Sequence, residues 1–225
     1  MVLFTYTPGT SPADKIFTKA IWNAAGSPND TELGEGWETI GEEAFRDTAI
    51  KSIAIPASVT IIGTRAFYGT SSLASVTFAS GSLLESIGGY AFYLSGLNSI
   101  AIPASVTTIG DSAFYSTSIL ASVTFASGSL LQSIGNRAFQ SSGLTSIAIP
   151  ASVTTIGEHA FNSASSLASV SFASGSRLQS IGSNAFQQTG LTSIAIPASV
   201  TTIGDSAFNV ASSLTSVTFA EFSQL

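Results

Sequence analysis

The chain has 225 residues but few charges, since only 9% of its residues are charged and its net charge at neutral pH is −6. Seven Lys and Arg residues cannot form a basic stripe, which excludes a nucleic-acid partner. The absence of cysteine excludes disulfide bridges, thiolate catalysis and zinc–thiolate sites. No long apolar run and no basic, apolar N-terminal stretch occurs, so the sequence predicts neither membrane insertion nor a secretory signal.

Residues 1–36 do not repeat, and we expect them to form an N-terminal cap made of a strand and an amphipathic helix. The helix is predicted over 11–26, with a capping box that begins at Ser11, Pro12 at the first helical position and a stop at Gly26. Its apolar stripe would contain Ile16, Phe17, Ala20, Ile21 and Ala24. Because a column of repeats needs its open end covered, this helix is expected to lie over the first repeat.

An Ala-Phe pair then recurs at steps that alternate between 22 and 25 residues, and the pairs end at Phe45, Phe67, Phe92, Phe114, Phe139, Phe161, Phe186 and Phe208. The 22-residue type, which we call the A coil, reads LTSIAIPASVTTIGDSAF at 191–208. The 25-residue type, the B coil, reads LASVTFASGSLLQSIGNRAF at 120–139. The sequence therefore predicts a repeat solenoid of eight coils over 37–225.

Each coil is predicted to be mainly β, with one short strand that adds to a ladder along the stack. In SIAI and SVTF, alternate residues such as Ile102 and Phe125 face inward. Pro103 ends the strand because proline cannot donate to a ladder, as do Pro56, Pro150 and Pro197 in the other A coils. A second extended piece, SVTTIG, precedes DSAF, where Asp111 is expected to cap a brief α or 3₁₀ turn.

Stacking of equal coils explains why the sequence repeats almost letter for letter. Strand spacing would place identical side chains about 4.7–4.9 Å apart, so every interior coil meets the same neighbours. We expect one ladder from the eight Ala-Phe phenylalanines. A second ladder would alternate Phe78, Phe125, Phe172 and Phe219 with Ile55, Ile102, Ile149 and Ile196.

No cap is visible after the last coil, which ends in AEFSQL where earlier B coils read ASGSLL. Uncovered strand edges tend to pair with other strands. The sequence therefore predicts self-association through this coil, or a longer protein of which the chain is a part.

The pattern LxSIxIPxSVTxIGxxAF resembles the BspA-type leucine-rich repeats over residues 37–225. That family often has Cys three residues after the Phe, where this chain has the small residues Thr48, Thr70, Ser95, Thr117, Ser142, Ala164, Thr189 and Ala211. The resemblance implies a leucine-rich-repeat horseshoe without enzymatic activity. It also implies an extracellular or cell-surface location and a role in adhesion or protein binding.

Catalytic and metal sites are not predicted. The only histidine, His159, is interpreted as a solvent-facing turn residue. Asp111, Glu158 and Asp205 recur every 47 residues, which places them about 10 Å apart, too far to share a proton or a metal ion. The sequence therefore predicts a protein that is not an enzyme and has no cofactor.

The candidate binding residues lie beside the Ala-Phe pairs, where side chains vary on a constant scaffold. Four tyrosines fall in three successive coils, and they form a candidate site for a protein or a glycan with two arginines: Tyr68, Tyr90, Tyr93, Tyr115, Arg65 and Arg137. The alternative is that these are tolerant turn positions. Rival hypotheses are a purely structural segment of a larger surface or fibre protein, and an ice-binding solenoid that uses the Thr rows Thr107, Thr108, Thr154, Thr155, Thr201 and Thr202.

Overall fold

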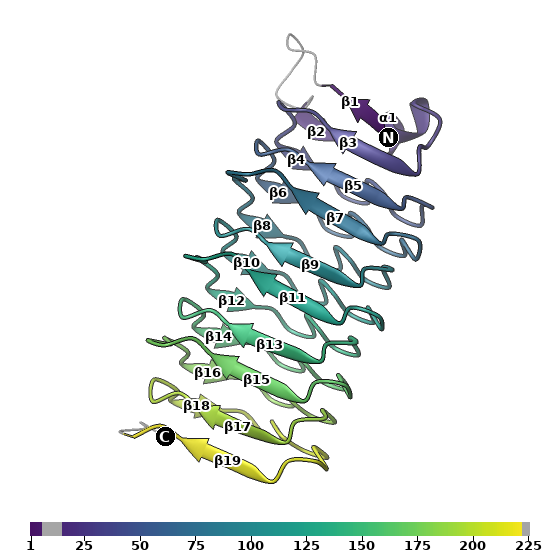
Figure 1. Cartoon of the computed structure of the whole chain (residues 1–225). Coiled ribbons are helices and arrows are strands. Elements are labelled where there is room, and N and C mark those ends of the chain that lie inside the picture. The colour runs from purple at the N-terminus through teal and green to yellow at the C-terminus, as the bar shows by residue number, and fades with distance from the viewer. Residues whose placement is uncertain (6–14, 222–225) are drawn as a thin grey trace.

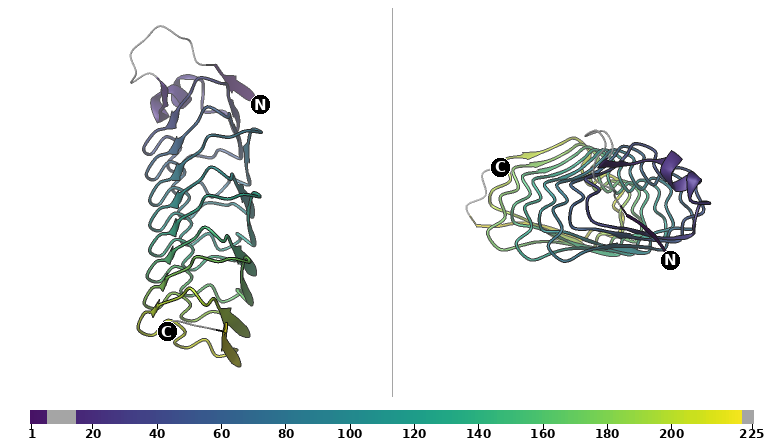
Figure 2. Two further views of the ribbon diagram at one scale, coloured as in Figure 1. Left: turned by 90° about the vertical axis from the view of Figure 1, so that its left-hand side faces the viewer. Right: turned by 90° about the horizontal axis from the view of Figure 1, so that it is seen from above.

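The computed structural model describes residues 1–5 and 15–221, which form a column of stacked turns whose paired strands are all parallel (Figure 1). Two strand ladders run along the column on opposite sides, which we call the front and back sheets (Figure 2). The described part contains one short helix, α1 (Lys19–Ala24), beside the first turns. The fold is a parallel β-solenoid, as the repeats predicted.

The front sheet is made from the strands of the repeats, which read SIAI, SVTF or SVSF, together with two earlier strands, VLF and DTEL. It is divided by hydrogen bonding into two parts. One contains β1 (Val2–Phe4), β3 (Asp30–Leu33), β5 (Ser52–Ile55) and β7 (Ser75–Phe78). The other contains β9 (Ser99–Ile102), β11 (Ser122–Phe125), β13 (Ser146–Ile149), β15 (Ser169–Phe172), β17 (Ser193–Ile196) and β19 (Ser216–Phe219).

The back sheet is continuous and has nine strands of two residues each, one for each turn of the column. They are β2 (Ile16–Phe17), β4 (Thr39–Ile40), β6 (Ile61–Ile62), β8 (Ser86–Ile87), β10 (Thr108–Ile109), β12 (Ser133–Ile134), β14 (Thr155–Ile156), β16 (Ser180–Ile181) and β18 (Thr202–Ile203). The Ala-Phe pairs predicted eight coils, and the structure has one further turn, which contains β2, before the first of them.

The core is a ladder of stacked phenylalanine rings. The eight predicted rings are joined by a ninth, Phe17, and neighbouring centroids lie 4.9–5.6 Å apart with nearly parallel planes. All of them except Phe208 are completely buried. The second expected ladder forms only within each pair of an A coil and the next B coil, since Phe125 pairs with Ile102, whereas Phe78 is not paired with Ile102 nor Phe125 with Ile149. Ile102 is buried whereas Phe125 is only half-buried.

The predicted helix over 11–26 is too long. Ile16 and Phe17 form β2 and pair with β4, because the stack offers their backbone a parallel partner and their side chains a place in the core. The capping residues Ser11 and Pro12 lie outside the described residues. In α1 the buried residue is Trp22, whose ring meets Phe45 edge-on at 5.9 Å, rather than the predicted stripe.

The Ala-Phe pairs lie in tight turns, which we call AF corners. No helical turn forms there in the described residues. Instead, two residues in each corner have left-handed backbone, such as Ser112 (φ 57°) and Ser116 (φ 55°). The N–H groups of Ser112, Phe114 and Ser116 each donate to a carbonyl of the following coil at 2.7–2.9 Å. These bonds between coils offset the cost of about 1–2 kcal/mol that left-handed backbone imposes on a non-glycine residue.

Hydrogen bonding in the front sheet is strong from an A coil to the next B coil and weak from B to A. β9 and β11 pair over four residues, and the N–H of Ala126 extends the ladder by donating to Ile102 O at 3.0 Å. β11 and β13 share one residue pair, and β7 and β9 are not bonded. The residue after Ile102 is Pro103, which has no N–H to donate to Phe78. The strands therefore separate at their carboxyl ends wherever an A coil follows a B coil.

Candidate binding surfaces

The four predicted tyrosines come together on the outside of three successive AF corners. The rings of Tyr68 and Tyr93 stack with centroids 4.7 Å apart, and those of Tyr93 and Tyr115 stack at 5.2 Å. Tyr90 lies beside them, tilted by 52° and 5.9 Å from Tyr93. We call this cluster of Tyr68, Tyr90, Tyr93 and Tyr115 the tyrosine row.

Two arginines extend the row toward the N-terminus. The guanidinium of Arg46 lies over the Tyr68 ring, 5.2 Å from its centroid, and that of Arg65 lies over Tyr90 at 5.7 Å. Glu43 Oε1 accepts a hydrogen bond from Arg46 Nη1 at 2.6 Å and lies 3.8 Å from Arg65 Nη1. The hydrogen bond with Glu43 and the charge of that carboxylate raise the pKa of Arg46 above its ordinary value.

Of the described arginines, the predicted candidate Arg137 does not stack on the tyrosine row, whereas Arg46 does. Within the described residues, Arg137 makes no ring contact or ion pair with the tyrosine row, and the residues at its position in the two adjacent coils are Ser112 and His159 rather than tyrosines. Arg46 was not among the candidates although it stacks on Tyr68. The signal was available, since Arg46 follows Phe45 as the tyrosines follow their phenylalanines.

The tyrosine row presents edges and hydroxyl groups rather than open ring faces. Tyr68, Tyr93 and Tyr115 cover each other's faces and are half-buried, while Tyr90 is 38% exposed. Burial raises the pKa of Tyr93 above its ordinary value of 10.0, and the neighbouring tyrosines add to the effect. Leu94 occupies the same corner and is also exposed. The surface therefore combines apolar area, hydroxyls and two arginines that pair with the carboxylates of Glu43 and Asp47.

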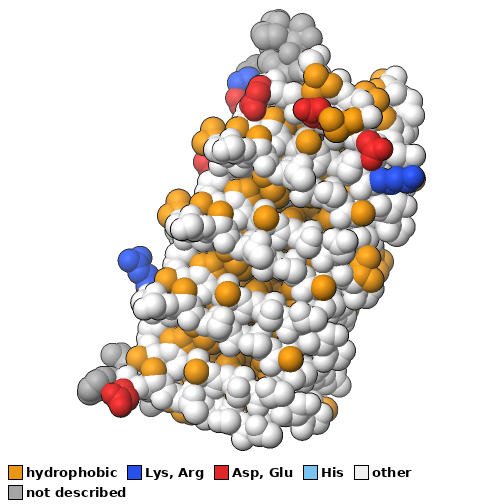
Figure 3. Space-filling model, in the orientation of Figure 1, with side chains coloured by type: hydrophobic (Ala, Val, Ile, Leu, Met, Phe, Trp, Pro, Cys, Tyr) orange, Lys and Arg blue, Asp and Glu red, His pale blue; other side chains and the backbone are white. Residues whose placement is uncertain are grey.

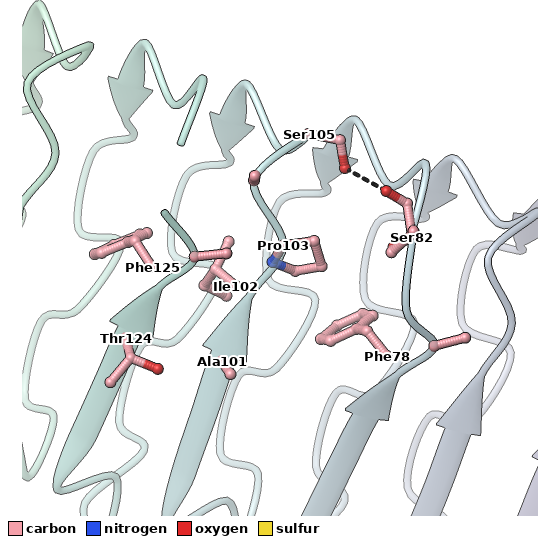
Figure 4. A pocket seen from close by; sticks show the side chains of 12 residues that line it. Phe78, Ser82, Ala101, Ile102, Pro103, Ser105, Thr124 and Phe125 are labelled. Atoms are coloured by element: carbon pink, nitrogen blue, oxygen red, sulfur yellow. Dashed lines mark hydrogen bonds between the residues drawn. The ribbon is translucent and has the colours of Figure 1, made fainter. Parts of the chain in front are cut away.

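Apolar hollows on the front side form a second surface, which sequence reasoning missed. The first lies between the half-buried rings of Phe78 and Phe125, over Ile102 and Pro103, and has a volume of about 370 Å³ (Figure 4). Equivalent hollows at Pro150 and Pro197 have volumes of about 510 and 560 Å³. Figure 3 shows recessed hydrophobic bands that recur down this face.

The hollows follow from the alternation of the two coil types. Because Pro103 cannot donate to Phe78, the strands separate there. The three extra residues of a B coil lie in a loop that includes Gly81 and Ser82, which line the hollow, and the shorter A coil is recessed between two such loops. The proline was visible in the sequence, but the exposure of the phenylalanine ring was not.

The acidic residues after IG do not cap their own turns. Asp111 Oδ1 accepts a hydrogen bond at 2.7 Å from the N–H of Asn136, which lies in the following coil. His159 is half-buried, and its Nδ1 is 3.2 Å from Asn162 Nδ2. Within residues 1–5 and 15–221, no group of three or more histidine or acidic side chains could hold a metal ion. In the same residues, no helix is long and apolar enough to cross a membrane.

The Thr rows are less uniform than an ice-binding surface would need. Along the back sheet, the exposed Thr108, Thr155 and Thr202 alternate with Ser133 and Ser180. The hydroxyls of the neighbouring Thr107, Thr154 and Thr201 donate instead to backbone carbonyls of the preceding coil. The structure therefore does not favour this alternative.

Comparison with known families agrees with the repeat geometry. The family model described as a BspA type leucine-rich repeat region matches with six copies, over residues 38–141 and 132–224. The chain belongs to the BspA-type leucine-rich repeat family. Leucine-rich repeat proteins with this fold are typically non-enzymatic scaffolds. No curated protein matches the chain.

Several solved structures share the solenoid. A leucine-rich repeat protein from T. pallidum superposes with a TM-score of 0.67 at 24% identity, over 81% of this BspA-type chain and 86% of the other. A leucine-rich repeat protein from Bacteroides ovatus gives 0.59 at 25% identity, over 81% of this chain and 58% of the other. The pneumococcal vaccine antigen PcpA gives 0.53 at 23% identity, over 82% and 68%. These likenesses show the fold.

Proposed function

We propose that this BspA-type repeat chain is a non-enzymatic recognition module that binds a protein ligand through the tyrosine row. One observation carries the proposal: the rings stack into a continuous surface on AF corners whose backbone is otherwise constant. Tyrosine gives large contact area and a hydroxyl at low entropic cost, which is why it is enriched at binding sites.

A protein ligand suits the tyrosine row better than a glycan. Sugars bind aromatic side chains by lying on an open ring face. In the tyrosine row, both faces of Tyr93 are covered by Tyr68 and Tyr115, and Arg46 lies over Tyr68. The exposed ring edges and hydroxyls instead match the backbone carbonyls and apolar side chains of a peptide. A glycan is therefore the second candidate.

We further propose that the module works at a cell surface in adhesion. The support is family membership together with the likeness to PcpA, described as a vaccine antigen. The small neutral residues that face outward on the front sheet, such as Ser122 and Ala101, offer no comparable anchors, so ligand contact is assigned to the corners.

The experiment is binding of the wild-type chain to arrays of immobilised surface proteins and glycans. The test variant replaces Tyr68, Tyr90, Tyr93 and Tyr115 with Ser. A matched control replaces the residues after Phe in the next four coils, Gln140, Asn162, Gln187 and Asn209, with Ser. We expect the test variant to lose at least about tenfold in affinity for the captured protein, since each buried aromatic anchor contributes more than about 1 kcal/mol.

Both variants must first show the circular dichroism spectrum and melting temperature of a folded column. Equal affinity of the test variant and the wild type for the captured protein would contradict the role of the tyrosine row. Binding to glycans alone, with loss in the same variant, would replace the protein ligand by the second candidate.

A further inference from the structure

The first A coil shows which chemical group its proline turn binds. The turn runs from Pro56 to Val59, where the N–H of Val59 donates to Pro56 O at 3.4 Å. The two N–H groups between them, of Ala57 and Ser58, donate to the two carboxylate oxygens of Glu35, each at 3.1 Å. Successive N–H groups in a turn form a concave site for an anion. The protein therefore contains one filled carboxylate site.

The same turn recurs in the later A coils, where the site is open. The turns close in the same way, by hydrogen bonds of 3.1–3.2 Å from Val106, Val153 and Val200 to the prolines. In these turns, the two central N–H groups have no hydrogen-bond partner in the described part of the chain. The three pairs of residues are Ala104 and Ser105, Ala151 and Ser152, and Ala198 and Ser199. The reason is in the preceding coil. Counted back from its Ala-Phe pair, the residue at the position of Glu35 is Ser82, Ser129 or Ser176, in a loop two residues longer than the one that holds Glu35.

Each open turn lies in the wall of one of the three apolar hollows. Ala104 and Ser105 line the first hollow, and the equivalent pairs line the other two (Figure 4). The linings of all three contain no charged residue. The equivalent hollow beside Pro56, which Glu35 also lines, is smaller, at about 250 Å³. An unoccupied carboxylate site therefore stands beside apolar space for the rest of a side chain.

We propose that the three open turns receive carboxylate side chains of an acidic peptide that runs along the column. The hollows recur every two coils, which is at least about 9.4–9.8 Å at the spacing of bonded parallel strands, and slightly more because one of the two steps joins strands that separate. A polyproline II helix advances about 9.3 Å in three residues, so every third side chain faces the same way at nearly this spacing.

Other peptide conformations fit this surface less well. Side chains on one face of a β-strand repeat at about 6.6–6.8 Å. An α-helix returns to the same face after seven residues, about 10.5 Å, but its backbone carbonyls are hydrogen-bonded within the helix. A polyproline II helix makes no internal hydrogen bonds. The exposed hydroxyl of Thr124, which lines two adjacent hollows, can donate to the carbonyls that such a helix leaves free.

The probe is an acetylated and amidated peptide with four Glu-Pro-Pro repeats, labelled for fluorescence anisotropy. Two comparison peptides separate charge from spacing. One has Gln in place of Glu, and the other has four Glu-Pro-Pro-Pro repeats, which keep the charge but lengthen the interval. We expect the first peptide to bind at least about tenfold more tightly than either, since hydrogen bonds to a charged group are roughly twice as strong as neutral ones.

The first protein variant places a carboxylate of the chain itself in each of the three open turns. Ser82→Glu, Ser129→Glu and Ser176→Glu together copy the position of Glu35 in the three open coils and should abolish peptide binding. The matched control is Ser80→Glu, Ser127→Glu and Ser174→Glu, which adds the same charge to the same loops at exposed positions that do not line the hollows. The control should lose much less affinity than the Ser82 series, because exposed charges are partly screened at physiological ionic strength.

A third variant removes the donors without adding charge. Ala104→Pro, Ala151→Pro and Ala198→Pro each delete one N–H at the second position of the turn, which proline favours. We expect a loss of about tenfold or more. Replacing the tyrosine row with Ser should leave peptide binding unchanged, so this proposal and the proposed function fail separately.

Three results would overturn the proposal. The first is equal binding of the Glu and Gln peptides. The second is equal loss in the Ser82 and Ser80 series, which would reduce the effect to net charge. The third is tighter binding of oligogalacturonate than of the peptide, which would assign the carboxylate sites to an acidic polysaccharide.

Discussion

Removing one ring from the phenylalanine ladder tests the energetics of the column. Phe114 is completely buried, and its ring stacks at 5.1 Å on Phe92 and at 5.1 Å on Phe139. Phe114→Ala leaves a cavity in the middle of the stack, which costs about 3–5 kcal/mol. We expect a cost in the upper part of that range, because two ring contacts are lost and each aromatic pair contributes about 0.5–1.5 kcal/mol beyond its buried area.

The control is the same change at the last ring of the ladder. Phe208 is half-buried and stacks on Phe186 alone among the described residues, with centroids 5.6 Å apart. We expect Phe208→Ala to cost less than half as much as Phe114→Ala. Urea denaturation followed by circular dichroism gives both free energies of unfolding.

Two outcomes would refute this reasoning. One is a cost below about 1 kcal/mol for Phe114→Ala, which would mean that the ladder is not tightly packed. The other is an equal cost at Phe208, which would mean that stacking between coils does not set the stability. A broadened transition with a lower slope would instead show that the column unfolds in parts, as repeat arrays can.

Three further predictions follow from the structure. Gly110→Ala should destabilise the fold by about 3 kcal/mol, because the added Cβ would lie 2.7 Å from Gly89 N. Gly128→Ala, in open space at φ +75°, should cost only about 1 kcal/mol, the cost of the left-handed backbone. Thermal melts of the two variants compare these costs. Because the pKa of Tyr93 is raised in the folded chain, its hydroxyl loses a proton at lower pH in the unfolded chain than in the folded one. The free energy of unfolding should therefore fall as the pH rises above about 10. Tyr93→Phe should weaken this pH dependence in urea titrations. Self-association through the last described strand, β19, stays a prediction, and Phe219 in this strand is 52% exposed. A charged residue at a strand edge opposes pairing, so Thr218→Lys should abolish any dimer seen by sedimentation velocity. An unchanged dimer would place the contact elsewhere.

The repeat made the interior of the column predictable. Once the 47-residue period is known, the pairing of Phe125 with Ile102 follows, because identical coils can stack in only one register that keeps the apolar side chains inside. The tyrosine row follows from the same rule, since residues after Phe must lie one above another. Local propensity was not needed for either prediction.

Features that depend on neighbouring coils were harder to predict. Ile16 and Phe17 have a helical pattern in the sequence, but the strand β4 gives them a parallel partner, and this tertiary contact decides the outcome. The left-handed backbone at Arg65 and His159 has no local signal, because the hydrogen bonds that hold it come from the next coil. The open N–H pair of Ala104 and Ser105 is visible only by comparison with the turn that Glu35 fills.

The alternation of A and B coils makes the pair of coils the natural unit of change in length. A single inserted coil would place two proline turns or two long loops together, whereas duplication of a whole pair would preserve every contact. Each added pair would contribute one more hollow and two more corners at a constant interval. A lineage of such proteins could therefore raise its valence toward a long ligand, and with it the avidity, by copying DNA rather than by changing a single side chain.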